Sequence, residues 1–298
     1  MSDEQRARFA CWLNTSSIPF PESIRMWLLD LVVGRELTQT ELKAIDSKLF
    51  LDLADSAQSH IFLDGKWETD FSNWAAFFAS RSRIIFDVGG HIGYFTALMA
   101  KQSPDATLHT FEPNPNVRAI LKRNVEVNRL PVTLEPFAIA DTDGTATFFL
   151  PHRLRLGTGR MGNLLYSDEQ ITVETTSLDR YCAQNNIAYV DLIKMDIEGG
   201  EARALPGMRE GLHAERYGVL LAEFHQTIMS PEETESVLNE LESAGYYLYE
   251  VHPDRLARAR SITTSYFCAM SPSVYRNLGS PENNFRLPVK TKLPYPLT

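Results

Sequence analysis

The chain has 298 residues, of which 44% are hydrophobic, an ordinary composition for a globular protein with a sizeable core. Lys and Arg number 29 against 38 Asp and Glu, so the net charge of −9 argues against a broad nucleic-acid-binding surface. Three widely spaced cysteines suit neither a metal site nor a disulfide framework, and no apolar run resembles an export signal or a membrane span. We therefore expect a cytoplasmic protein that acts on a small molecule and binds neither nucleic acid nor membrane.

The first 80 residues carry apolar positions at helical spacing. Four aromatic residues at spacings of three and four close this stretch, which favours a helix packed on the following domain: Phe71, Trp74, Phe77 and Phe78. We predict an N-terminal helical segment over residues 1–80 that caps the site or forms a homodimer contact.

From Ile84 onward, short apolar runs alternate with polar stretches of helix length, and helices are predicted over residues 116–128 and 230–244. The strand candidates are IIFDV, TLHTFE, VTLEPFA, VDLIKMDI and VLLAEF. This alternation predicts an α/β domain over residues 81–275, built on a doubly wound, mostly parallel sheet. YYLYEV and SYFCAM should complete the sheet edge, and a proline-rich tail over residues 276–298 should lie on the surface.

A hairpin is predicted as an insertion over about residues 144–176, because Asp143-Gly144 is a turn signal between two β-rich runs. The loop between those runs, residues 151–170, is long and basic. It could close over the site as a lid and meet an anionic acceptor, although a solvated loop explains its charges equally well.

Chemistry-bearing residues begin at the turn Asp87-Val-Gly-Gly-His-Ile-Gly93, which follows the first strand of this domain. Glycine allows positive φ angles and lets a ligand approach the backbone, so the turn favours a nucleotide-like ligand. The dinucleotide fingerprint would need glycine where Val88 stands, whereas the acid that ends this strand points to adenosylmethionine. Glu112, after the next strand, could accept hydrogen bonds from both ribose hydroxyls.

Four segments in order, DVGGHIGYFT, FEPNPNVRAILKRNVEVN, DLIKMDIEGGE and LLAEFH, resemble the FkbM-type methyltransferases over about residues 84–226. Gly90 and His91 replace the alanine and asparagine usual in that family. The resemblance implies a class I methyltransferase (Rossmann-like) fold, S-adenosylmethionine as methyl donor, and oxygen methylation of small natural products or sugars. A carrier-tethered acceptor is one anionic partner that the basic loop over residues 151–170 could meet.

Carried over by position, the resemblance implies three groups of cofactor contacts. The methionine part would lie along Asp87, Gly89, Gly90, His91 and Gly93. The ribose would be held by Glu112, next to Asn114, and Ala138 to Asp141 would pass the adenine. Asp141 also begins an Asp-Thr-Asp-Gly turn, which explains that acid as well as adenine contact does.

Period-two alternation in VDLIKMDIEGGE places Lys194, Asp196 and Glu198 on one face of the strand. Ligands of open parallel sheets bind beyond the carboxyl ends of the strands, where Asp196 and Glu198 should emerge as cofactor or catalytic groups. For Lys194, a structural ion pair with a carboxylate competes with a catalytic role.

Glu223-Phe-His225 ends the adjacent strand and places a carboxylate and an imidazole near the same edge. We predict His225 as the general base that takes the proton of the acceptor hydroxyl, with Glu223 or Asp196 orienting its ring. The same three side chains could instead bind a divalent metal ion that lowers the pKa of the hydroxyl.

Two further functions use the same sheet. A methyltransferase acting on nitrogen would share the fold and the cofactor site. A nucleotide-dependent oxidoreductase or a binding module would share only the sheet, and titration with adenosylmethionine and with NAD(H) separates it from the methyltransferases.

Overall fold

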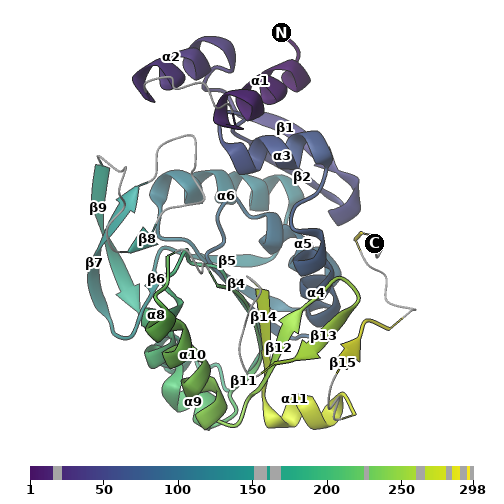
Figure 1. Cartoon of the computed structure of the whole chain (residues 1–298), viewed down its shortest axis with the longest axis vertical. Coiled ribbons are helices and arrows are strands. Elements are labelled where there is room, and N and C mark those ends of the chain that lie inside the picture. The colour runs from purple at the N-terminus through teal and green to yellow at the C-terminus, as the bar shows by residue number, and fades with distance from the viewer. Residues whose placement is uncertain are drawn as a thin grey trace.

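A nine-stranded sheet forms the centre of the protein (Figure 1). The structure is a computed structural model, and it describes residues 1–15, 22–150, 160–161, 169–224, 228–259, 266–279, 284–288 and 294–295. In spatial order its strands are β15 (Asn284–Arg286), β13 (Arg255–Arg258), β12 (Tyr247–Val251), β14 (Tyr266–Met270), β11 (Tyr217–Glu223), β10 (Val190–Met195), β3 (Ile84–Val88), β4 (Thr107–Phe111) and β5 (Val132–Glu135).

The five strands from β11 to β5 are mutually parallel, and β14 runs antiparallel to both of its neighbours. Helices cover both faces: the N-terminal helices with α4 and α5 share one buried core, and α7 to α10 contribute to the other (Figure 1). The predicted α/β, doubly wound, mostly parallel sheet is therefore confirmed.

The sheet edge differs from the prediction. SYFCAM forms β14, which lies between β11 and β12, and YYLYEV forms β12. Two strands absent from the prediction, β13 and β15, lie outside β12 and make the edge. Their short runs carry charged residues, so alternation alone did not identify them.

The helices are α1 (Asp3–Thr15), α2 (Glu22–Val32), α3 (Ser56–Asp64), α4 (Thr69–Ala79), α5 (Tyr94–Gln102), α6 (Pro115–Asn128), α7 (Leu178–Gln184), α8 (Glu201–Ala204), α9 (Arg209–His213), α10 (Pro231–Ser243) and α11 (Pro272–Asn277), with 3₁₀ turns η1 (Lys43–Ile45) and η3 (Leu205–Met208). Ser230 and Glu233 form a capping box that starts α10 at the predicted place. Within the described ranges, no helix has the length and apolar character that a membrane span needs.

The N-terminal segment is predicted to be helical over residues 1–80, but in the structure it is only partly helical. A hairpin of β1 (Thr38–Leu42) and β2 (Ser47–Leu51) interrupts it, and Leu49 and Leu51 are buried on that hairpin. The four aromatic residues of α4 are buried as expected, and they belong to the same core as the central sheet. Residues 1–80 therefore contribute directly to the main core.

The predicted hairpin is present and belongs to a separate small sheet. β7 (Gly144–Leu150) pairs with β9 (Glu169–Thr176), and β6 (Ala138–Ile139) and β8 (Arg160–Met161) complete it. The run VTLEPFA, predicted as one strand, splits at Pro136 into β5 and β6 of different sheets. Proline donates no hydrogen bond to a ladder, which explains the break. Nearly all of the predicted lid loop falls outside the described residues.

The described part of the C-terminal tail contacts the core instead of lying only on the surface. Leu287 and Tyr295 are buried. The backbone nitrogen of Tyr295 donates to Oδ1 of Asn73 at 3.1 Å, and its hydroxyl hydrogen-bonds that of Tyr94. The expectation of a surface tail is thus wrong at these two residues.

Trp74→Ala should lower the free energy of unfolding by about 3–5 kcal/mol, because the indole is fully buried and its nitrogen donates to the carbonyl of His252 at 2.8 Å. Urea denaturation measures the loss. Trp27→Ala is the matched control, since Trp27 is 61% exposed and should change stability by about 0.5 kcal/mol or less. Similar losses in both variants would contradict the packing described here.

Candidate cofactor and active site

Four strand ends place a row of residues side by side at the carboxyl edge of the sheet. The pairing register aligns Phe111, Val88, Met195 and Ala222 across β4, β3, β10 and β11. The next residues along these strands are Glu112, Gly89, Asp196 and Glu223. The row brings together groups from positions more than 100 residues apart in the chain, at the edge where open parallel sheets bind ligands.

A cavity of about 470 Å³ opens above this row. Its lining includes the following residues that the sequence singled out: Gly89, Gly90, His91, Glu112, Asn114, Ala138, Lys194, Asp196, Glu198 and Glu223. A cavity of this size lies in the range typical of small-molecule and cofactor sites.

The glycine turn after β3 leaves no room for side chains. At Gly89, which has φ of +81°, an added Cβ would lie 1.9 Å from the backbone oxygen of Asp196. At Gly90 it would lie 2.1 Å from Cγ2 of Thr110. The backbone of this turn therefore forms part of the cavity floor, as close approach of a ligand requires.

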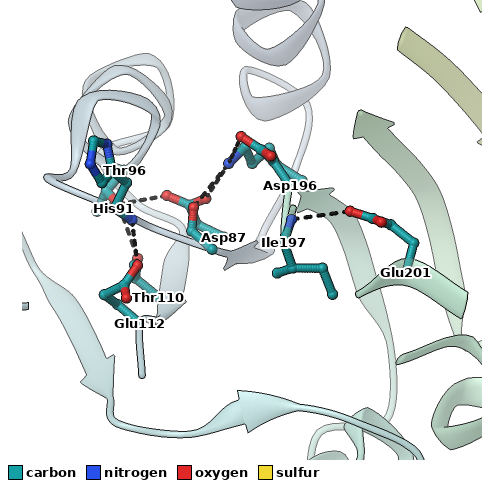
Figure 2. Close-up of polar contacts among 10 residues, drawn as sticks. Asp87, His91, Thr96, Thr110, Glu112, Asp196, Ile197 and Glu201 are labelled. Atoms are coloured by element: carbon teal, nitrogen blue, oxygen red, sulfur yellow. Dashed lines mark hydrogen bonds and ion pairs between the residues drawn. The ribbon is translucent and has the colours of Figure 1, made fainter. Parts of the chain in front are cut away.

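Glu112 is held with its carboxylate in a fixed position. Oε2 accepts a hydrogen bond from the backbone nitrogen of His91 at 2.9 Å (Figure 2). Oε1 accepts one from the backbone nitrogen of Asn114, also at 2.9 Å. Burial raises the pKa of Glu112 to about 7, although both backbone donors and the Arg118 guanidinium act to lower it. Each oxygen retains acceptor capacity for a hydroxyl group, which fits the predicted ribose contact.

Lys194 lies beneath the row, and its side chain is 2% exposed. Its ammonium donates to the carbonyl of Gly89 at 3.0 Å and lies 3.6 Å from Oδ1 of Asp87 and from Oδ2 of Asp196. Burial lowers the pKa of Lys194, but the two carboxylates outweigh it and the pKa is raised. The ion pair considered for Lys194 is thus present, and Lys194 also lines the cavity.

The chain turns sharply after β10, and the side chain of Glu201 stabilises this turn. Its buried carboxylate accepts a hydrogen bond from the backbone nitrogen of Ile197 at 3.1 Å (Figure 2). Glu198 and Gly199 both have positive φ, of 54° and 86°. This turn directs Asp196 and Glu198 toward the cavity.

Several predicted contacts are placed differently. Asp87 is completely buried below the turn, where Oδ2 accepts a 2.6 Å hydrogen bond from Thr96, so it supports the site from beneath. Gly93 starts α5 with φ of 89° and does not line the cavity. Asp141 is exposed and lies outside the described lining, as its alternative role in a turn implies. His225 lies outside the described residues.

One wall of the cavity was not predicted from any pattern in the sequence. Residues of α3 and of the link to α4 form it, including Asp55, His60, Trp67 and Glu68. Burial raises the pKa of Tyr266, and the carboxylates of Glu68, Glu223 and Asp196 raise it further. Glu68 precedes α4 with a left-handed backbone and does not cap it.

The metal alternative gains no support from the described residues, among which no group of three His, Cys, Asp or Glu side chains could hold a metal ion. Asp196 and Glu223 both line the cavity, whereas His225 is not described. Metal dependence therefore stays a hypothesis.

A doubly wound sheet with a glycine turn after its central strand and a ligand-facing acid after the next strand defines the class I methyltransferase fold. A profile of the family described as "Methyltransferase FkbM domain" matches residues 87–248, more than half of the chain. The chain belongs to this family.

Three curated relatives are similar to part of this chain. They are the 31-O-demethyl-FK506 methyltransferase FkbM of Streptomyces tacrolimicus (28% identity; 43% of this chain and 60% of the relative), the 2-O-methyltransferase NoeI of Sinorhizobium fredii (28%; 45% and 60%) and the hexuronic acid methyltransferase AglP of Haloferax volcanii (25%; 54% and 64%). This chain thus spans less than two thirds of each relative's length.

Among solved structures, a putative O-methyltransferase from Klebsiella pneumoniae is similar at 14% identity and a TM-score of 0.41, over 90% of this chain and 98% of the other.

The pKa of Glu112 predicts a pH-dependent affinity for adenosylhomocysteine. Ribose hydroxyls stabilise the carboxylate, so binding should release a proton below pH 7 and the affinity should rise with pH until it levels off above the pKa of about 7. Calorimetric titration between pH 5.5 and 8.5 should show a slope of at most about tenfold per pH unit. Glu112→Gln should bind more weakly with a flat profile, and an unchanged slope in that variant would contradict the assignment.

Lys194→Met should lower the free energy of unfolding by about 3–5 kcal/mol, because Asp87 then keeps a buried carboxyl group without its counter-charge. Urea denaturation measures this loss. The double variant Asp87→Asn with Lys194→Met should recover part of it. If the single variant were as stable as the unmodified protein, the ion pair would not hold the strand ends together.

Proposed function

We propose that this protein transfers a methyl group from S-adenosylmethionine to a hydroxyl oxygen of a small natural product or sugar. The observation that carries the proposal is the cavity at the carboxyl edge, where Glu112 is oriented by two backbone donors next to a turn that only glycine fits. The relatives' names, which include a 31-O-demethyl-FK506 methyltransferase and a 2-O-methyltransferase, support oxygen as the acceptor atom.

The lining residues fit the cofactor part by part. Glu112 would hold the ribose hydroxyls, and Ala138 with Asn114 would border the adenine end of the same cavity. The backbone of Gly89 and Gly90 offers a close approach to the methionine part. When bound, adenosylmethionine supplies a methyl group on a positively charged sulfur.

The chain's own contribution to the reaction is positioning and proton removal. Methyl transfer needs the acceptor oxygen in line with the sulfur–methyl bond, and Glu223 lines the same cavity as Glu112. In the proposal, His225, which stands two residues after Glu223 in the chain, accepts the proton of the acceptor hydroxyl. Glu223 or Asp196 orients the imidazole and stabilises its charged form. Glu198, which lines the same cavity, is a further candidate in this group.

Titration with adenosylhomocysteine and with NADH tests the cofactor. Binding of the former, and none of the latter, is expected, because Val88 stands where a dinucleotide turn needs glycine. Methyl transfer is then followed with radiolabelled adenosylmethionine on a panel of sugars and hydroxylated natural products. Binding of NADH alone would refute the proposed activity.

His225→Ala should lower the turnover number with the best acceptor by at least about a hundredfold and leave the affinity for adenosylhomocysteine unchanged. His213→Ala is the matched control, since that imidazole lies beside Glu240 and neither residue lines the cavity. Unchanged turnover in His225→Ala would remove the base assignment, and loss of activity on exhaustive chelation would favour the metal alternative.

A further inference from the structure

Helix α2 exposes an apolar stripe on the outside of the protein. Trp27 is 61% exposed, Leu31 64% and Ile24 43%. Successive residues of an α-helix are rotated by about 100°, so these three side chains share one face with the half-buried Leu28. Leu29, which is fully buried, lies on the opposite face and belongs to the main core. The helix thus has two apolar faces, and the described part of the chain covers only one of them.

The exposed face of α2 is remote from the cavity. Figure 1 places α2 at one end of the long axis of the molecule and α11 at the other. The described lining of the cavity contains no residue of α1 or α2. A contiguous exposed apolar patch marks an interaction site, whereas scattered single apolar residues do not. A helix that is apolar on both faces is normally covered on both.

The charges of the two N-terminal helices favour a second protein surface over a lipid surface. α1 and α2 together contain four acidic residues, three arginines and no lysine. A helix that lies on a membrane carries an excess of Lys and Arg on its polar face, where it meets the headgroups. A nearly neutral pair of helices in a chain of net charge −9 is instead a place where two copies of this chain can approach with little repulsion.

The stripe is complementary to itself when two copies of α2 lie antiparallel. A two-fold axis between Trp27 and Leu28 places Ile24 of one copy opposite Leu31 of the other, since both residues are equally far from that axis along the helix. Each flank of the helix then meets the same flank of its copy, so the two Trp27 side chains are neighbours. Offset or edge-to-face indole pairs add to the stability of such a contact.

The area of the stripe matches what a weak, specific dimer needs. Side chains exposed to this degree present on the order of 350 Å² on one copy, so pairing would bury about 700 Å² of apolar surface. The polar side chains beside the stripe, which include the ion pair of Asp30 with Arg35, would raise the total to about 1,000 Å², the lower limit for a specific interface. A dissociation constant on the order of 10 µM is expected for this size.

We propose that this protein forms a two-fold symmetric homodimer through the exposed face of α2, packed antiparallel against α2 of a second copy. Ile24, Trp27, Leu28 and Leu31 form its apolar centre. The inference does not depend on the proposed methyl transfer. Ile61, which lines the cavity, belongs to the same core as Leu29, so one continuous core joins the dimer contact to a wall of the site.

Sedimentation velocity of the full chain between about 1 and 200 µM tests the association. Trp27→Glu and Leu31→Glu should each raise the dissociation constant of the dimer at least about a hundredfold, because both place a carboxylate in the apolar centre. Asn277→Glu, which adds the same charge at an exposed position of α11, is the matched control and should leave the dimer intact. Below the dissociation constant, both α2 variants should unfold at the urea concentration of the unmodified protein.

Cysteine cross-linking tests the orientation, in a Cys11→Ser background because Cys182 and Cys268 are buried. Ile24→Cys and Leu31→Cys should form a disulfide-linked dimer when the two variants are mixed and oxidised. Neither should do so alone, since an antiparallel pair leaves each cysteine about 10 Å from its own copy along the helix, too far for a disulfide. Cross-linking of each variant alone would overturn the antiparallel arrangement.

Two other outcomes would overturn the dimer itself. One is a protein that remains monomeric over the whole concentration range, and the other is a dimer that Trp27→Glu and Leu31→Glu do not weaken. A monomer that co-sediments with vesicles of phosphatidylcholine and phosphatidylglycerol, and loses this binding in Trp27→Glu, would assign the face of α2 to a lipid surface instead. The affinity for adenosylhomocysteine should be the same in all of these variants, because α2 does not line the cavity.

Discussion

The buried ammonium of Lys194 is the interaction on which the arrangement of the site depends. It joins the two central strands, since Asp87 lies on β3 and Asp196 follows β10, and it also holds the carbonyl of Gly89 in the turn. A single cation thereby fixes the turn that approaches the ligand and the acid that lines the cavity. Because the ammonium is shared among several acceptors inside the protein, it is poorly placed to bind an anionic acceptor.

The N-terminal segment and the C-terminal tail meet at the wall of the cavity that the sheet does not supply. Trp67 and Tyr94 line that wall, and the backbone nitrogen of Trp67 donates to the Tyr94 hydroxyl at 3.3 Å. Tyr295 from the tail hydrogen-bonds the same hydroxyl. The wall is therefore assembled from three distant parts of the chain, and its shape depends on segments outside the family domain of residues 87–248.

The central sheet and the positions of Glu112, Asp196 and Glu223 could be predicted because each depends on a local pattern: an apolar run, a glycine turn, or an acid at a strand end. Asp87 was predicted as a cofactor contact but is completely buried. Alternation predicts on which face of a strand a side chain lies, and it does not predict how deeply that side chain is buried. Glu68 and Trp67 could not be predicted as cavity-lining residues, because only tertiary folding brings α3 and α4 to the cavity. The position of β14 between β11 and β12 is likewise a long-range choice that no local pattern encodes.

The strand order has a consequence for the size of the ligands. Glu112 follows β4 and Glu223 is the last residue of β11, three positions away in the sheet. Neighbouring strands are about 4.8 Å apart, so the two acids are separated by about 14 Å across the sheet. On the proposed assignment, ribose, sulfur and acceptor lie along this line, and the methyl group moves across the strands instead of along them. Backbone hydrogen bonds thus fix the distance between donor and acceptor ends, and side chains such as Trp67 and Glu68 remain to determine which acceptor fits.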